Sequence, residues 1–341
     1  MKKTLLSKEL KNKKVACFTC QRRCTVAPGE WGFCKTRVNK NGKLYSVIYG
    51  VVSSINIDPI EKKPVFHYKP GSPCLSLGTY GCNFRCSFCQ NWDISHANGV
   101  SLNIDNQKLL SPKEALKMAK KSEASGIAWT YNEPAIWLEY SLDGAKLAKK
   151  QGIYTCWVTN GYATKEAIDI IAPYLDIYRV DLKSFDNRFY RKLIGIPQAK
   201  GVFETTKYVH NKYPDIHIEC VTNIIPTWND SGKNLKKIAS WIVKNLGKKT
   251  PWHVTRFFPY GDLTNVPPTP PETLYKAREI GIKQGLEFVY IGNMNVDKED
   301  DTFCPKCGNL AVRRTGYSVE ILGVDKNGHC SDCGENLNIR M

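Results

Sequence analysis

The sequence lacks any long, uninterrupted hydrophobic segment. No run approaches the roughly 18 apolar residues that a membrane-spanning helix requires. Near the start, only Leu5 and Leu6 form an apolar pair before charged residues return, which is too short for the core of a signal peptide. These absences argue against a transmembrane or secreted protein, so we expect a soluble, cytoplasmic protein with no membrane partner.

Internal repeats and low-complexity tracts are absent as well. Hydrophobic residues make up 42% of the chain and charged residues 24%, which is ordinary for a globular protein. This composition excludes a disordered, collagen-like or coiled-coil chain. At about 150 residues per domain, the 341 residues predict two domains, or one large α/β unit.

Cysteine, by contrast, is abundant, with 14 residues. In a reducing compartment such clustering indicates metal ligation rather than disulfides. Three cysteines, Cys74, Cys156 and Cys220, are solitary and lie in predicted strands, where we expect buried core thiols. The other eleven fall into three sets that carry most of the functional information.

These sets divide the chain into three predicted parts. Residues 1–70 hold the first set between turn signals and predict a loop-rich, metal-organised module. Residues 71–295 hold the second set and form the predicted core. After an acidic linker at 297–301, the third set marks a small C-terminal module, which we place at 296–341.

The predicted core alternates short, β-branched apolar runs with helical patterns. The predicted strands are 74–79, 126–131, 153–159, 177–182, 216–222, 252–258 and 288–291. Ser111–Glu114 and Thr269–Glu272 each supply an N-cap, a first-turn proline and a capping-box glutamate. The alternation predicts an α/β fold with a parallel sheet, either doubly wound or curled toward a barrel. Active residues should then lie at the carboxyl ends of the strands.

The second set, Cys82, Cys86 and Cys89, follows the first predicted core strand with the spacing C-x3-C-x2-C. An amphipathic helix is the structural alternative, because these positions would share one helical face. Gly81, Asn83 and Ser87 are weak helix formers, and α/β proteins bind cofactors directly after such a strand. Three thiolates can hold three irons of a 4Fe-4S cluster and leave the fourth iron open to a small chelating molecule.

This motif, with the aromatic Phe88 before its last cysteine, resembles that of the radical S-adenosylmethionine (SAM) enzymes. The likeness extends along nearly the whole chain. The sequence is similar to the radical enzyme of the AmmeMemoRadiSam system, a branch related to pyruvate formate-lyase activating enzymes. The segments that carry the likeness are Asp58–Pro64, His67, Gln90–Trp92, Thr130–Pro134, Thr159–Gly161 and Asp181–Lys183.

The resemblance implies a partial (β/α)6 barrel with the cluster loop after the first strand. It implies that SAM binds the open iron and is cleaved reductively to a 5′-deoxyadenosyl radical, which abstracts a hydrogen atom from the substrate. An electron donor such as flavodoxin or ferredoxin would supply the electron. The resemblance also implies that AMMECR-like and Memo-like companion proteins act in the same pathway.

SAM presents an ammonium, a carboxylate, a ribose and an adenine, and polar strand ends offer partners for them. We expect Glu133 to accept from the ammonium, with a helix-start role as the alternative. Thr159 and Asn160 are candidates for the ribose or carboxylate, although Asn-Gly is also a common turn. Asp181 and Lys183 match an Asp-Leu-Lys of the activating enzymes whose lysine lies near the SAM carboxylate, with a structural salt bridge as the alternative.

On the same resemblance, the cofactor-binding set includes Phe88, Gln90 and Asn132, and Lys183 also counts as catalytic. Two departures from the activating enzymes stand out. Tyr131-Asn132-Glu133 replaces their Gly-Gly-Glu, and Gly261 stands where they have a histidine after Pro-Tyr. Either His253 substitutes for that histidine or the substrate end of the site differs.

The two outer sets have metal-site spacings. Two C-x2-C pairs near the C-terminus predict a closed zinc ribbon, with a rubredoxin-like iron as the alternative. The N-terminal C-x2-C-x3-C-x9-C set suits zinc or an auxiliary iron–sulfur cluster, and we favour zinc. The C-terminal ligands are Cys304, Cys307, Cys330 and Cys333, and the N-terminal ligands are Cys17, Cys20, Cys24 and Cys34.

The chain carries 49 Lys and Arg against 32 Asp and Glu, and residues 1–70 alone carry 15 against 4. This excess would attract an acidic protein surface or a nucleic acid such as RNA, although much of it also fits a solvated surface. We therefore expect a radical SAM enzyme with a macromolecular substrate. The alternatives are a glycyl-radical enzyme activase and a non-enzymatic zinc-ribbon adaptor that binds nucleic acid.

Overall fold

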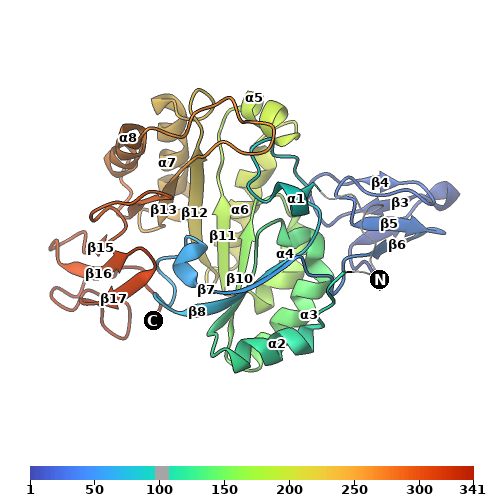
Figure 1. Cartoon of the computed structure of the whole chain (residues 1–341), viewed down its shortest axis with the longest axis horizontal. Coiled ribbons are helices and arrows are strands. Elements are labelled where there is room, and N and C mark those ends of the chain that lie inside the picture. The colour runs from blue at the N-terminus through green and yellow to red at the C-terminus, as the bar shows by residue number, and fades with distance from the viewer. Residues whose placement is uncertain (97–106) are drawn as a thin grey trace.

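The computed structural model describes residues 1–96 and 107–341. Its centre is a sheet whose strands follow the order β14-β13-β12-β11-β10-β9-β8-β7 (Figure 1). All strands from β8 to β14 are parallel, and β7 pairs antiparallel with β8. The strands are β7 (Ser54–Pro59), β8 (Pro73–Gly78), β9 (Gly126–Trp129), β10 (Tyr154–Thr159), β11 (Ile177–Asp181), β12 (His217–Ile224), β13 (Trp252–Arg256) and β14 (Val289–Gly292).

The strand order decides between the two predicted architectures. A doubly wound sheet reverses its order at a switch point, whereas a barrel adds each strand beside the preceding one. From β8 to β14 the spatial order equals the chain order, so the core is an open, barrel-type α/β sheet. All seven predicted strands are present. The partial (β/α)6 expectation is exceeded by one parallel strand and by β7, which lies within the predicted N-terminal module.

Helices cover one face of the sheet. The longer ones are α2 (Pro112–Lys121), α3 (Leu138–Lys149), α4 (Lys165–Ile171), α6 (Lys200–Lys212), α7 (Gly232–Leu246) and α8 (Pro271–Lys283). The predicted capping box of Ser111 and Glu114 is present. The prediction for Thr269 was wrong, because α8 has Pro270 as its N-cap residue and the Thr269 hydroxyl instead donates to the Ile224 carbonyl at 2.6 Å.

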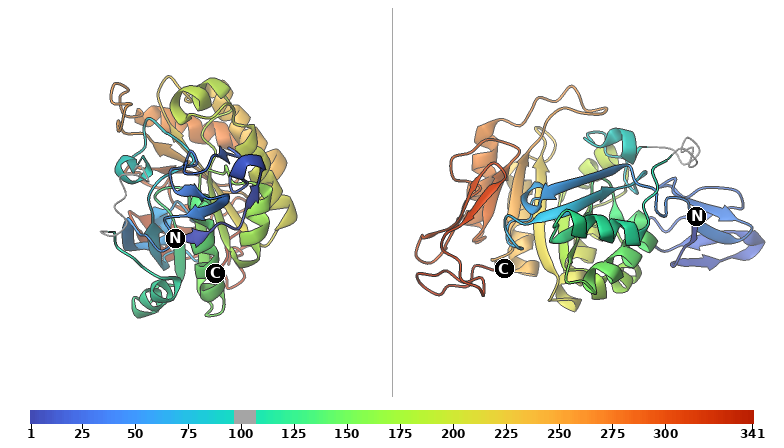
Figure 2. Two further views of the ribbon diagram at one scale, coloured as in Figure 1. Left: turned by 90° about the vertical axis from the view of Figure 1, so that its right-hand side faces the viewer. Right: turned by 60° about the horizontal axis from the view of Figure 1, so that its bottom comes forward.

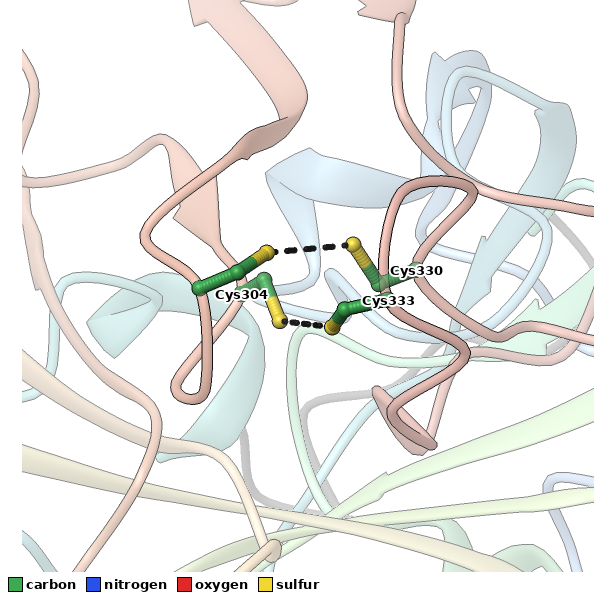
Figure 3. Close-up of side chains that lie close together, drawn as sticks. Cys304, Cys330 and Cys333 are labelled. Atoms are coloured by element: carbon green, nitrogen blue, oxygen red, sulfur yellow. Dashed lines mark hydrogen bonds between the residues drawn. The ribbon is translucent and has the colours of Figure 1, made fainter.

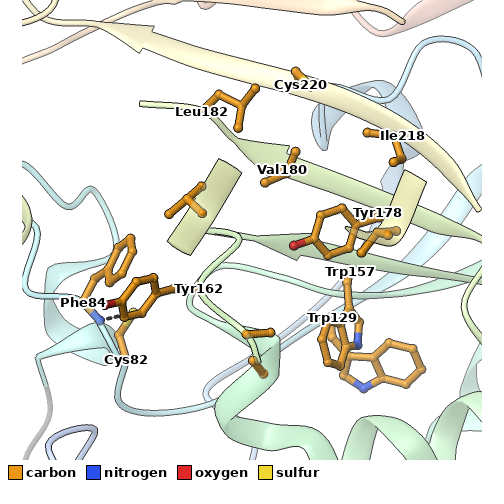
Figure 4. Packing of buried hydrophobic residues seen from close by; sticks show 14 of the residues in the cluster. Cys82, Phe84, Trp129, Trp157, Tyr162, Tyr178, Val180, Leu182, Ile218 and Cys220 are labelled. Carbon is orange, nitrogen blue, oxygen red and sulfur yellow. Dashed lines mark hydrogen bonds between the residues drawn. The ribbon is translucent and has the colours of Figure 1, made fainter. Parts of the chain in front are cut away.

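Successive side chains along the strands point to opposite faces of the central sheet. One face packs against the helices, and the other carries the candidate active site described below. Trp129, Trp157 and Tyr178 stand side by side in register and belong to the main core (Figure 4). Trp129 touches Gly144 of α3, so this is the helix-covered face. On the opposite face, Cys74 and Cys156 belong to a smaller buried cluster, and both are fully buried as predicted. Cys220 is also fully buried, on the helix side.

Two small β modules flank the core at opposite ends (Figures 1 and 2). The N-terminal one is more regular than predicted, with sheets β1-β6-β5 and β2-β3-β4. Its strands are β1 (Lys2–Lys3), β2 (Ser7–Glu9), β3 (Val15–Cys17), β4 (Thr25–Val26), β5 (Arg37–Lys40) and β6 (Lys43–Ser46). The C-terminal sheet consists of β15 (Thr302–Phe303), β16 (Leu310–Thr315) and β17 (Ser318–Ile321). Within the described ranges, no helix is long and apolar enough to cross a membrane.

Candidate active site

The loop that carries Cys82, Cys86 and Cys89 leaves the carboxyl end of β8. It contains no helix, so the amphipathic-helix alternative is excluded. Cys82 is buried, and Cys86 and Cys89 are half-buried. We call residues 81–90 the cluster loop.

Backbone hydrogen bonds from distant segments hold the cluster loop. The amides of Arg85 and Ser87 donate to the carbonyls of Ile194 and Leu193, both at 2.9 Å. The Ser87 carbonyl accepts from the amides of Asp262 and Leu263 at 2.7 and 3.1 Å. Since the cluster loop has no helical or strand hydrogen bonds of its own, its conformation depends on these partners.

The turn at Gly261 explains one departure from the activating-enzyme pattern. Gly261 has φ +63°, and a Cβ there would lie 2.7 Å from both the Ser87 carbonyl oxygen and the Trp92 ring. A histidine therefore does not fit beside this loop. His253 does not replace it, because it is buried at 1% exposure and its Nε2 lies 2.6 Å from Glu219. Among the described residues, no histidine lines the cavity.

A cavity of about 350 Å³ opens beside the cluster loop at the carboxyl ends of the strands. This volume lies within the roughly 300–1,000 Å³ typical of small-molecule sites. Most of the predicted site residues meet here, drawn from the cluster loop, β10, β11 and the segments that follow the strands. The predicted residues that line the cavity are Cys82, Cys86, Phe88, Cys89, Gln90, Asn132, Thr159, Asn160, Asp181 and Lys183.

Glu133 does not line this cavity, which corrects the expectation that it accepts from the SAM ammonium. Its side chain is fully buried, and its carboxylate accepts from the Ala135 amide at 2.9 Å and from the Thr159 hydroxyl and Asn160 amide at 2.8 Å each. Burial raises the pKa of Glu133 to about 7, and these hydrogen bonds oppose that shift. Glu133 begins a 3-10 helix at Pro134 and ties it to the end of β10.

Asp181 and Lys183 form the salt bridge that was the alternative to SAM binding, and both also line the cavity. Lys183 Nζ lies 2.9 Å from Asp181 Oδ2, and Arg179 contacts the other carboxylate oxygen. Burial favours the neutral forms, but the ion pairs prevail, so the pKa of Asp181 is lowered and that of Lys183 is raised. Burial raises the pKa of Cys86 to about 12, and Lys183 opposes that shift. A largely enclosed cation, with 12% of its side chain exposed, therefore lies close to the cysteine set.

Sequence reasoning missed several lining residues. Arg179 lies two positions before Asp181 on the same strand, so the two-residue period could have placed it on this face. Lys63 is only 3% exposed, lines the cavity, and has its Nζ 2.6 Å from Asp58. Both residues lie in the segment Asp58–Pro64 that carries the family likeness, but neither was predicted as a site residue. On β12, Asn223 lines the cavity, whereas its neighbour Thr222 is buried and donates to the Leu182 carbonyl.

The C-terminal cysteines form a compact set (Figure 3). Their four sulfur atoms lie within 4.8 Å of one another, with 3.5 Å between Cys304 and Cys333 and 3.7 Å between Cys307 and Cys330. Four thiolates around zinc, at about 2.3 Å from the ion, give sulfur–sulfur edges of about 3.8 Å. The donor set and its spacing therefore fit one tetrahedral metal ion.

The N-terminal cysteines also converge, on a second and smaller cavity. This cavity is lined by Cys17, Cys20, Cys24 and Cys34 and adjoins the cluster loop at Asn83. Among the described residues, only the C-terminal set brings all four candidate ligand atoms within 4.8 Å of one another. The four N-terminal cysteines thus line one cavity, but their sulfur atoms lie farther apart than those of the C-terminal set.

Comparisons with known proteins agree with this geometry. Residues 76–242 match the model of the radical SAM superfamily. An uncharacterised protein of Methanocaldococcus jannaschii is 38% identical over 99% of both chains. Pyruvate formate-lyase 1-activating enzyme of Escherichia coli is 24% identical, over 47% of this chain and 65% of that enzyme.

A solved structure shares the fold. The radical SAM methyltransferase from Sphaerobacter thermophilus superposes with a TM-score of 0.51 at 15% identity and covers 65% of this chain and 67% of its own. The region matched by the family model contains the end of β8, the cluster loop and β9 to β12, where the predicted cluster ligands and most of the cavity-lining residues lie. The non-enzymatic adaptor alternative is therefore wrong, and the chain belongs to the radical SAM superfamily as an enzyme of that family.

Proposed function

We propose that Cys82, Cys86 and Cys89 hold a 4Fe-4S cluster and that SAM binds in the 350 Å³ cavity beside them. Membership of the radical SAM family implies both the cluster and SAM. The observation that carries the proposal is the arrangement of three thiols and several polar strand ends around one cavity of suitable size. The cluster, when bound, supplies the electron that cleaves SAM to a 5′-deoxyadenosyl radical for hydrogen abstraction.

The chain's own groups suit the parts of SAM. The Lys183 ammonium, which lines the cavity, is a candidate partner for the carboxylate, and Asp181 keeps it charged. The side-chain amide of Asn132 is already hydrogen-bonded within the protein, because it donates to the carbonyls of Thr79 and Gly81 at 3.0 and 2.8 Å. Asn132 therefore holds the backbone at the start of the cluster loop. We assign Thr159 and Asn160 to the ribose or carboxylate, and Phe88 and Gln90 to the wall next to the cluster.

Asp181 replaces Glu133 as the candidate acceptor for the SAM ammonium. It is the acidic residue that lines the cavity, whereas Glu133 is enclosed behind β10. Its carboxylate already contacts Arg179 and Lys183, so the three groups together form a mixed-charge surface. Such a surface can meet the ammonium and the carboxylate of one amino-acid moiety at the same time.

For the substrate, we propose a macromolecule with an acidic or polyanionic surface, within the AmmeMemoRadiSam system. The support is the charge of residues 1–70, which carry 15 basic against 4 acidic residues. Most of this segment, through β6, forms the module beside the cluster loop. The AMMECR-like and Memo-like companions are the first proteins to test, and RNA is the alternative. If the protein binds RNA through its phosphates, the logarithm of its affinity for RNA should fall steeply and linearly with the logarithm of the salt concentration.

A second candidate function is the activation of a glycyl-radical enzyme. The likeness to the activating enzyme of Escherichia coli over 163 residues favours it. The missing Gly-Gly pair and the tightly packed Gly261 count against it, because both depart from the pattern of the activating enzymes. Transfer of the radical to a partner's glycine, detected by electron paramagnetic resonance, would select this function.

The test of SAM cleavage compares cysteine variants. Anaerobically reconstituted and reduced Cys86→Ala should form no 5′-deoxyadenosine from SAM, with the metals at both termini still bound. Cys74→Ala is the matched control, because Cys74 is a fully buried thiol on β8 outside the cavity lining. Full cleavage activity in Cys86→Ala would refute the ligand assignment.

We further propose that the C-terminal set binds zinc as a ribbon. A closed site of four thiolates leaves no open position on the metal, so its role is structural or in docking rather than catalytic. Cys304, Cys307, Cys330 and Cys333 belong to two turns that face each other across the site (Figure 3). Metal analysis of purified protein, before and after Cys330→Ser, tests this assignment.

A further inference from the structure

The four-cysteine cavity of the N-terminal module has a volume of about 20 Å³. A space of roughly 10–15 Å³ is enough for one water-sized occupant. The cavity therefore has room for one water-sized occupant between the four thiols. The four thiols can bind one ion if their sulfur atoms draw closer together than they lie here.

The walls of this cavity suit metal-bound thiolates. The Thr36 hydroxyl donates to Cys34 Sγ at 3.1 Å, and the guanidinium groups of Arg22 and Arg37 line the cavity. Arg37 is 2% exposed and held in place by Glu139 at 2.9 Å. Four thiolates around a divalent ion carry two negative charges, which nearby cations and hydroxyl donors stabilise.

Asn83 brings an unpaired polar group to the same cavity. Its side chain is fully buried, and its Nδ2 has no hydrogen-bond partner among the described residues. Buried donors are nearly always paired. A metal-bound thiolate is an acceptor that could pair with such a donor.

We propose that Cys17, Cys20, Cys24 and Cys34 bind one zinc ion. We further propose that this ion fixes the N-terminal segment that contacts the cluster loop, and so holds the loop in position. Zinc is the mononuclear ion that four thiolates bind in tetrahedral structural sites. The proposal goes beyond the SAM chemistry, because it assigns a second metal centre and a positioning role to the N-terminal module.

The segment that carries the proposed zinc ligands contacts the cluster loop directly. Arg22, between Cys20 and Cys24, donates from Nε to the Asn83 carbonyl at 2.5 Å. Arg85 of the cluster loop donates from Nη2 to the Phe33 carbonyl at 2.8 Å, directly before Cys34. A Cβ at Gly81 would lie 2.6 Å from the Cys34 carbonyl oxygen, so the two backbones touch.

Asn83 extends the connection to the large cavity. Its Oδ1 accepts from Asn160 Nδ2 at 2.7 Å, and Asn160 lines the proposed SAM site. Loss of the N-terminal ion should therefore loosen both the cluster loop and the wall formed by Asn160. The N-terminal metal is thereby a condition for stable loading of the cluster.

The first experiment counts metals in the absence of the radical cluster. The full chain with Cys82→Ala, Cys86→Ala and Cys89→Ala, purified anaerobically from zinc-supplemented cells, should hold about two zinc ions per chain and no acid-labile sulfide. Adding Cys20→Ser and Cys24→Ser should lower this to about one. Iron and sulfide in the triple-alanine protein, or zinc content unchanged by the added serines, would overturn the zinc assignment.

Loss of zinc in the serine variants could also result from misfolding, so a further experiment looks for a positive spectroscopic signal of metal binding. In the triple-alanine chain that also carries Cys330→Ser and Cys333→Ser, only the N-terminal set remains, and cobalt(II) should give the thiolate charge-transfer and visible bands of a tetrahedral site. Absence of these bands in a protein with native circular dichroism would refute the site. Because the cluster ligands are absent here, the outcome is independent of the proposed SAM chemistry.

The second experiment tests the support of the cluster loop. Cys24→Ser in the otherwise natural chain should reduce iron and sulfide incorporation on reconstitution severalfold and shift the electron paramagnetic resonance spectrum of the reduced cluster. Cys333→Ser, which removes a ligand of the distant C-terminal set, is the matched control and should load iron normally. Loss of zinc from Cys24→Ser with unchanged iron loading and spectrum would overturn the positioning role.

Discussion

At the scale of single residues, Glu133 shows how one carboxylate can have two plausible roles. Its position after a strand suggested a ligand for an ammonium group, but the structure buries it and satisfies it with three protein donors. Spacing alone could not reveal this, because both roles place a glutamate at the same point in the chain. The deciding fact, whether the carboxylate faces the cavity, depends on tertiary packing.

We predict that Glu133→Gln lowers the stability of the fold and leaves SAM affinity nearly unchanged. The amide nitrogen of glutamine would face a donor, so one of the three hydrogen bonds is lost, which costs about 1–3 kcal/mol. Urea unfolding and SAM titration measure the two effects. Glu166→Gln, at an exposed salt bridge with Arg23, is the control and should change both little. A severalfold loss of SAM affinity in Glu133→Gln would restore the ammonium-binding role.

Lys183 carries the opposite prediction. Lys183→Met keeps much of the side-chain length but removes the cation beside Asp181, so SAM affinity should fall about tenfold or more, since a charged hydrogen bond contributes about 1.5–3 kcal/mol. Lys146→Met on α3, whose ammonium lies over the Tyr174 ring, is the control. Equal SAM affinity in both variants would contradict a role for Lys183 in binding.

At the scale of elements, the core strands were predictable because each is a short apolar run buried on both faces. The exception is β7, whose residues Asn56 and Ile57 are exposed, so no continuous apolar run marks it. The cluster loop was predictable from cysteine spacing, but its partners at Leu193, Ile194 and Asp262 were not, since backbone hydrogen bonds leave no trace in side-chain patterns. Sequence thus located the ligands, and only the fold identified what positions them.

The Gly261 turn gives a prediction at this scale. In Gly261→Ala the new methyl group would meet the Ser87 carbonyl and the Trp92 ring, so the cluster loop must shift. Iron–sulfur loading should fall, with little change in the secondary structure of the barrel. Gly316→Ala is the control, because it has a similar φ of +62° but nothing within 4 Å of the added Cβ. Normal loading of Gly261→Ala would show that the turn does not brace the loop.

At the scale of the whole molecule, a buried polar network joins the C-terminal module to the barrel. The ring of His67 lies 2.9 Å from the Leu337 carbonyl and 2.6 Å from the Tyr290 hydroxyl, and Arg314 donates to the Phe66 carbonyl at 2.9 Å. Burial lowers the pKa of His67 to about 3, so the histidine is neutral in the folded protein. The module is thus attached by buried hydrogen bonds from a neutral histidine and from the Arg314 guanidinium.

This network predicts a direction of pH dependence. The unfolded chain binds a proton at His67 below about pH 6.5, whereas the folded chain does so only near pH 3. The contribution of His67 to stability is therefore fully present above pH 6.5 and declines as the pH falls, by up to about 1.4 kcal/mol per pH unit. Urea unfolding of His67→Gln between pH 4 and about 7 should show a shallower slope than the natural chain. Identical slopes would rule out this linkage.

The contacts of the cluster loop also bear on the order of events during synthesis. The cysteines at 82, 86 and 89 leave the ribosome early, but the carbonyl and amide groups that fix their loop belong to residues 193, 194, 262 and 263. A nascent chain shorter than this has all three thiols and no scaffold to present them. Delivery of iron and sulfide should therefore be a late, post-translational event that acts on a nearly finished chain.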